Sequence, residues 1–161
     1  MKIENKEMLL YSMNKAIDNA VTELKNEDTK EVFYAVGTAV HWIVDCIDRV
    51  DELYGLEISD KEMRLALHGA NNALKHCVDF VALHEQEYGY DFPYDFPIGM
   101  KVFYEWKDLS KVKLHHEIQK EMYQKILRGR HIENTLIEIK ERVNYLFEEI
   151  ENKGSEDNVG I

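Results

Sequence analysis

The chain is short of the residues that interrupt regular secondary structure. Its 161 residues include two prolines and eight glycines. A β-sandwich or β-barrel needs many more turns than so few breaking residues can supply. Hydrophobic residues make up 45% of the chain and charged residues 32%, a composition too apolar for intrinsic disorder. The composition therefore favours one helical domain with an ordinary hydrophobic core.

Cysteines and long apolar runs are scarce as well. Cys46 and Cys77 are the two cysteines, and no CxxC spacing joins them. A redox pair or a pair of metal ligands is one interpretation, but two small buried hydrophobic residues is the simpler one. No apolar run reaches the length of a membrane span, and the N-terminal segment lacks the features of a signal peptide. We therefore expect a cytoplasmic protein that does not contact a membrane.

Positive charge is in deficit over the whole chain. Its 31 acidic and 20 basic residues give a net charge of −11. Because this charge repels phosphate backbones, we expect no DNA partner. Residues 111–130 are the local exception, since six lysines and arginines there outnumber two glutamates for a balance of +4. RNA would bind at this stretch if it binds at all, whereas the simpler interpretation is a solvated helix face paired with acidic neighbours.

Apolar residues recur at intervals of three and four along five segments, which is typical of amphipathic helices. The helices are expected at 4–25, 29–53 and 59–87, from Asp108 or Ser110 to about 127, and from 132 to about 150. The fold class is therefore all-α: a single-domain bundle of about five helices over residues 1–152, with a flexible C-terminal tail at 153–161. The second helix is apolar over the widest arc, so we expect it at the centre.

Capping residues mark several of the expected helix ends. Asp28 and Ser59 each open the sequence pattern of a capping box, which begins a helix. Gly55 has the position of a C-terminal glycine cap. The triplet at 128–130 (RGR) predicts a break between the fourth and fifth helices.

Residues 88–107 are the one long region expected to lie outside the helices. The tetrapeptide Tyr-Asp-Phe-Pro occurs twice there, at 90–93 and 94–97, and eight aromatic residues lie between Tyr88 and Trp106. Residues 100–106 (MKVFYEW) have the composition of a short strand. Because a loop of this length usually serves a purpose, we expect it to pack against the bundle or a second subunit, with base stacking as the other interpretation.

The third helix carries the most distinctive polar pattern. Asn72 and His76 are four residues apart and are therefore neighbours on one helix face. A carboxamide can orient an imidazole that transfers a proton, so the pair predicts an acid–base unit. His68 and His84 extend this polar ladder in either direction. The simpler interpretation is a satisfied polar pair between packed helices.

The stretch Asn71–His76 resembles the motif of the HEPN family, whose members are compact helical bundles and in many cases metal-independent RNases. The family motif is an arginine, a polar residue that is commonly Asn, a few variable residues and a histidine. Asn72 and His76 match the last two of these, while Asn71 stands where arginine is expected. Because an amide binds phosphate more weakly than a guanidinium, this departure points to a weakened or non-catalytic member.

The resemblance implies a homodimer that acts on RNA or a partner protein, in a toxin–antitoxin or phage-defence system, without a metal or other cofactor. His76 would be the catalytic acid–base residue on the ribose 2′-hydroxyl, and Asn72 would orient it. The residues expected to bind the substrate are Asn71, Lys75, Lys113 and Lys120.

Two other classes of function stay open. His41, Asp45 and Asp48 fall at i, i+4 and i+7 of the second helix and share a face, as metal ligands in helical bundles do, with His76 or His115 as possible partners. A small interaction module is the third class. It would use the aromatic loop and the heptad pattern of the last helix.

Overall fold

The structure is a computed structural model and describes residues 3–87 and 100–156. Its elements, in chain order, are α1 (Lys6–Glu23), α2 (Thr29–Tyr54), α3 (Ile58–Lys75), β1 (Val81–Glu87), β2 (Met100–Trp106), α4 (Glu117–Ile126) and α5 (Ile132–Glu156). The expected bundle of about five helices is confirmed, and a two-stranded hairpin is added to it. Within the described ranges no helix is long and apolar enough to cross a membrane.

Helix α2 lies at the centre of the bundle, as its wide apolar arc predicts. It packs against α1, α3 and α5, and buried residues recur along it from Val32 to Val50. The Asp28 side chain accepts a hydrogen bond from the Lys30 backbone N–H at 3.1 Å, which caps the helix start. Gly55, with a φ of 74°, ends the helix. Both predicted caps of α2 are confirmed.

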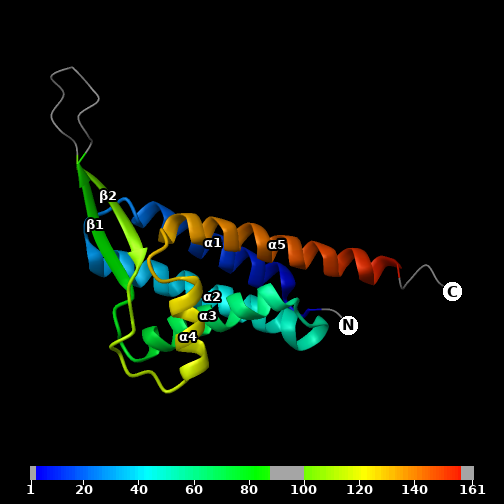
Figure 1. The fold of residues 1–161 in the computed structure, drawn as a ribbon. Helices are drawn as coiled ribbons and strands as arrows, with labels where there is room; N and C mark the ends of the chain where they lie inside the picture. The colour runs from blue at the N-terminus through cyan, green and yellow to red at the C-terminus, as the bar shows by residue number, and fades with distance from the viewer. Residues whose placement is uncertain (1–2, 88–99, 157–161) are drawn as a thin grey trace.

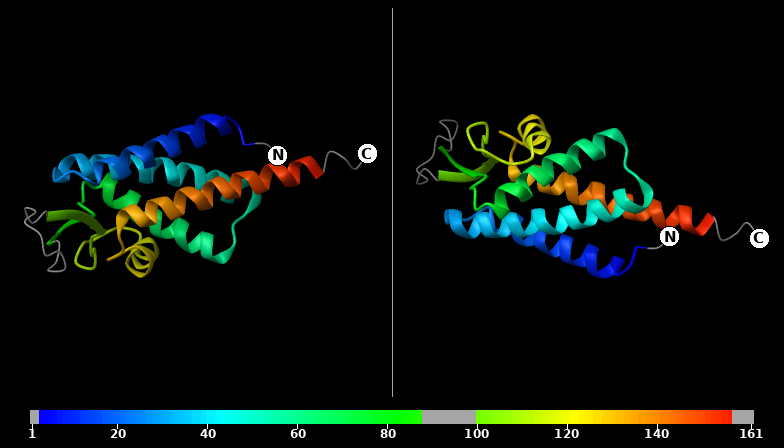
Figure 2. Two further views of the ribbon diagram at one scale, coloured as in Figure 1. Left: turned by 90° about the horizontal axis from the view of Figure 1, so that it is seen from above. Right: turned by 90° about the horizontal axis from the view of Figure 1, so that it is seen from below.

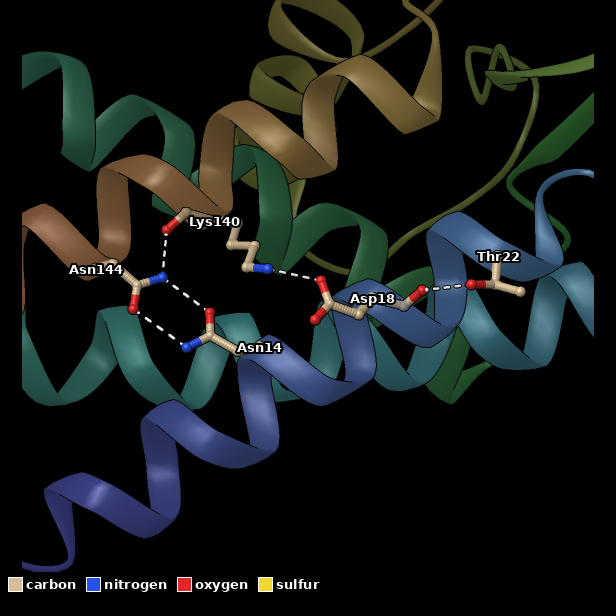
Figure 3. Close-up of polar contacts among 5 residues, drawn as sticks. All are labelled: Asn14, Asp18, Thr22, Lys140 and Asn144. Carbon is tan, nitrogen blue, oxygen red and sulfur yellow. Dashed lines mark hydrogen bonds and ion pairs between the residues drawn. The ribbon is translucent and has the colours of Figure 1, made fainter.

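Helix α5 lies against α1 through polar contacts (Figure 3). Asn14 and Asn144 donate to each other's side-chain oxygens, at 3.2 Å and 2.8 Å, and Asn144 also donates to the Lys140 carbonyl oxygen at 2.7 Å. The Lys140 ammonium lies 2.6 Å from an Asp18 carboxylate oxygen. Paired amides lose their partners when two helices slide past each other, so these contacts fix the register of α5 on α1.

The apolar seam of α5 follows the predicted heptad over most of its length. Ile132, Leu136, Ile139 and Val143 are buried, and Phe147 takes the next buried position. The helix runs to Glu156, so residues 153–156, which we expected in a flexible tail, are helical. Residues 157–161 of that tail lie outside the described residues. The last helix thus runs about one turn beyond the bundle expected over residues 1–152.

Helix α3 ends at Lys75, twelve positions before the expected end at 87. The Cys77 N–H donates to the Leu74 carbonyl at 3.0 Å and the Val78 N–H to the Ala73 carbonyl at 2.8 Å, while Cys77 has a φ of 55°. These are the two bonds and the left-handed residue of a Schellman motif. Glycine usually occupies that residue, and here cysteine does, so the usual sequence signal for a helix end is missing.

Substituting glycine at this helix end gives a direct test. Cys77→Gly is expected to raise the free energy of unfolding by about 1 kcal/mol, because glycine adopts a positive φ without the steric cost that a Cβ carries. Cys77→Ala is the control, since it removes the thiol and keeps the strain. Chemical denaturation of the three proteins measures the difference. Equal stability of the glycine and alanine variants would contradict a strained cap at this residue.

The two cysteines have different environments. Cys46 is buried in α2, as expected, and burial, reinforced by Asp45, raises the pKa of its thiol to about 12. Cys77 is exposed, so the prediction of two buried cysteines is wrong for this one. The error follows from the helix that was expected to continue through residue 77. Both thiols are free, so the structure holds no redox pair.

The segment expected to complete α3 instead forms the first strand of an antiparallel hairpin, with Val81 paired to Trp106 and His84 to Phe103. The predicted strand at 100–106 is confirmed as β2. The hairpin stands at the end of the bundle where α3 stops and α5 begins, far from the start of α1 (Figures 1 and 2). The repeated Tyr-Asp-Phe-Pro motif lies outside the described residues.

Aromatic side chains join the inner face of the hairpin to the helices. The Phe80 ring lies 5.2 Å from that of Phe33 on α2 and 5.9 Å from that of Trp106 on β2, and Trp106 meets Tyr123 of α4 edge to face. The Tyr104 hydroxyl donates to the Asn26 carbonyl at 2.6 Å. The hairpin is therefore part of the core at its base.

Helix α4 begins at Glu117, well after the expected start at Asp108 or Ser110. Asp108 caps a turn rather than the helix, because its carboxylate accepts from the Ser110 N–H at 2.8 Å and from the Gln124 side chain at 2.6 Å. The Ser110 backbone bond, followed by the Gln124 bond, lowers the pKa of Asp108 to about 2. The predicted break at 128–130 is confirmed, with Gly129 at a φ of 75°.

Candidate active site at the end of α3

The predicted catalytic histidine lies at the C-terminal end of α3, beside a second histidine. His76 is the C-cap residue, and its ring centroid is 5.5 Å from that of His115, in the segment before α4. Both histidines are exposed, as are Lys75 and Lys113. Neither lysine forms an ion pair with any residue in the described ranges. Two imidazoles and two free cations are thus brought to one end of the bundle.

Close packing of α4 on α3 makes this arrangement possible. A Cβ at Gly69 would lie 2.6 Å from the Gln119 carbonyl oxygen and 3.0 Å from the Tyr123 Cβ, so only glycine permits the contact. Gly69, Asn72 and His76 share one face of α3 at helical spacing. The face that meets α4 at Gly69 therefore continues to His76, where it meets His115.

Asn72 lies on this face but does not orient His76 through its side chain. Its residue is 9% exposed, and its side-chain nitrogen has no hydrogen-bond partner in the described part of the chain. The contact that joins the two residues is from the His76 backbone N–H to the Asn72 carbonyl, at 3.2 Å. A buried amide nitrogen without a hydrogen-bond partner is uncommon in folded proteins and lowers the stability of the fold. Asn72 is therefore a buried neighbour of the histidine pair.

The other predicted substrate-binding residues divide between surface and interior. Asn71, at the position of the motif arginine, is buried at 6% exposure, so its carboxamide does not lie with the exposed lysines. The Lys120 ammonium donates to the carbonyls of Ser110, at 3.1 Å, and Val112, at 2.6 Å. Lys120 thereby holds the segment that carries His115. Lys75 and Lys113 are the predicted cations that have no ion-pair partner within residues 3–87 and 100–156.

The three predicted metal ligands of α2 are not brought together. His41 lies 3.8 Å from Asp45, at the limit of an ion pair. Asp48 faces α3 instead, where its Oδ1 accepts from Arg64 Nε at 2.7 Å and lies 2.7 Å from His68 Nε2. Throughout residues 3–87 and 100–156, no group of three or more His, Cys, Asp or Glu side chains is arranged to hold a metal ion.

The sequence did not predict that Asp48 pairs with α3, and it placed His84 on a helix instead of a strand. His84 belongs to β1 and not to the helical ladder of α3, and its ring stacks on that of Phe103. The available signal for a strand was the apolar run at 81–83 (VAL), but it is short and fits a continuing helix equally well. The role of Asp48 had no local signal, because its partners come from another helix.

Comparison with known proteins adds no assignment. No family model matches the chain, and neither a curated protein nor a solved structure matches it.

Proposed function

We propose that this protein is a HEPN-like, homodimeric RNA-binding protein that cleaves RNA slowly and without a metal, at the His76–His115 pair. The observation that carries the proposal is the contact between two exposed imidazoles, with ring centroids 5.5 Å apart, near Lys75 and Lys113, which form no ion pair within the described residues. In a chain of net charge −11, such a local excess of positive charge favours a phosphate ligand.

Two imidazoles supply both proton transfers that cleavage of an RNA strand requires. The neutral imidazole removes the proton of the ribose 2′-hydroxyl, and the 2′-oxygen attacks the adjacent phosphorus. The bond from phosphorus to the 5′-oxygen breaks, and the protonated imidazole gives its proton to that oxygen. The products are a 2′,3′-cyclic phosphate and a 5′-hydroxyl. Lys75 and Lys113 offset the negative charge that develops on the phosphate oxygens.

The proposal differs from the HEPN motif in how it supplies charge and orientation. Asn71 is buried and does not replace the motif arginine at the phosphate. Lys75 and Lys113 bind the phosphate in its place. A lysine is a point charge without the planar fork of arginine, so weaker catalysis follows. The resemblance to the family supports the pairing of two copies in a dimer and a role in a toxin–antitoxin or phage-defence system.

A cleavage assay on an end-labelled single-stranded RNA, with chelator present, tests the proposal. His76→Gln and His115→Gln are each expected to slow cleavage about 100-fold, because each removes one proton-transfer group. Products should carry 2′,3′-cyclic phosphate ends, and a DNA strand of the same sequence should be inert. The measured mass in solution should be that of a dimer.

His41→Gln is the matched control, since His41 is an exposed histidine on α2 whose ring lies against Trp42 and Asp45 and not against His76 or His115. It should cleave at the wild-type rate. A wild-type protein without activity, or a His76→Gln variant as active as the wild type, would overturn the proposed cleavage. A strictly monomeric protein would remove the dimer.

A further inference from the structure

Three flat rings stand in one stack on the outer face of the hairpin. His84 of β1 and Phe103 of β2 are directly paired across the strands, and their rings are 5.2 Å apart with an interplanar angle of 16°. His131, just before α5, continues the row, with its ring 4.8 Å from that of Phe103 at 15°. A single backbone bridge between Glu105 and His131 places this third ring beside β2.

The stack is open to solvent at both ends. His84 and His131 are exposed, while Phe103, between them, is partly covered. The opposite face of the hairpin carries Tyr104 and Trp106 into the core, so the stack is not needed to fill it. Parallel rings in a row leave the outer face of each terminal ring free, and a further flat ring can add there.

We propose that the stack of His84, Phe103 and His131 is a platform on which unpaired nucleobases of single-stranded RNA stack. The identity of the polymer rests on the proposed function above. Base–aromatic stacking is the common way in which proteins hold unpaired bases, and it requires flat, exposed rings of this kind. The Nε2 of His84 lies 3.3 Å from a Glu105 carboxylate oxygen, so the ring nitrogens left for a base or a phosphate are those of His131.

The surroundings of the platform favour a nucleic acid strand. Arg128 and Arg130 lie on the tight turn that leads into His131. Arg128 is exposed and supplies a positive charge there, whereas Arg130 is paired with Glu138 at 2.7 Å. The hairpin also connects the platform to the candidate active site, since β1 starts shortly after His76 and β2 leads into the segment that carries His115. A strand whose bases stack on the platform would thus be held at the end of the bundle that carries the histidine pair.

Binding of a non-cleavable strand tests the platform separately from cleavage. We would measure fluorescence anisotropy with a short 2′-O-methyl oligoadenylate, which has no 2′-hydroxyl to react, and with an abasic strand of equal length. His84→Ser and His131→Ser are each expected to weaken binding of the oligoadenylate about fivefold or more, and to leave binding of the abasic strand unchanged. His84→Tyr and His131→Tyr should restore it, since they keep a ring without the imidazole.

His41→Ser is the matched control and should bind the oligoadenylate as the wild type does. No binding by the wild type, or equal binding by the serine variants, would overturn the platform. An equal loss on the abasic strand would also overturn it, because the histidines would then act through charge. Base-dependent binding without RNA cleavage would support the platform and remove the proposed catalysis, so the two failures are distinguishable.

Discussion

Gly69→Ala is expected to lower the free energy of unfolding by about 3 kcal/mol, which makes it one of the most damaging single-methyl changes in this chain. The new Cβ would lie 2.6 Å from the backbone carbonyl oxygen of Gln119. Backbone cannot rotate away as a side chain can, so α4 must move off α3. Because this packing brings His115 to His76, we expect the variant to lose the proposed RNA cleavage as well.

Gly37→Ala is the matched control for this substitution. Its Cβ would approach Leu74 Cδ1 at 2.8 Å, and that atom is the end of a flexible side chain that can rotate. Both glycines are inside helices, so the intrinsic helix preference of alanine contributes about 1 kcal/mol in each case and cancels in the comparison. Urea denaturation should show a loss of less than about 1 kcal/mol for Gly37→Ala. Similar stabilities of the two variants would contradict tight α3–α4 packing.

Arg142→Met is expected to lower the free energy of unfolding by about 3 kcal/mol, because it leaves the buried Asp60 carboxylate without its cation. Arg142 donates from Nε at 2.9 Å and from a terminal nitrogen at 2.7 Å, one bond to each Asp60 oxygen. These bonds raise the pKa of Arg142 above its ordinary value. The pair joins α5 to α3 beside a cleft of about 260 Å³.

Arg130→Met is the control for the loss of an arginine–carboxylate pair. Arg130 lies 2.7 Å from Glu138, but both side chains are largely exposed, so water replaces the contact at a cost below about 1 kcal/mol. The double variant Asp60→Leu with Arg142→Met should recover part of the loss, since no charge is then buried alone. Thermal and urea denaturation of the four proteins would settle the comparison. A double variant less stable than Arg142→Met would contradict the interpretation.

Helix ends were predictable where a residue with a strong local preference marked them. Asp28 and Gly55 bound α2 as expected, and Gly129 separates α4 from α5. The predicted cap at Ser59 is displaced, because α3 begins at Ile58 and Glu57 precedes it without a side-chain cap. The end of α3 was missed because Cys77 holds a conformation that glycine usually signals.

The sequence by itself determined the helical class, the central position of α2 and the strand at 100–106, because these depend on composition and on the spacing of neighbouring residues. Tertiary structure decided which polar side chains meet. His76 meets His115 only because α4 packs on α3 at Gly69. Asp48 contacts His68 rather than His41, because α3 packs against this side of α2. Strand pairing likewise assembled the ring stack of His84, Phe103 and His131. Contacts between distant segments depend on how whole elements pack, and local spacing does not carry that information.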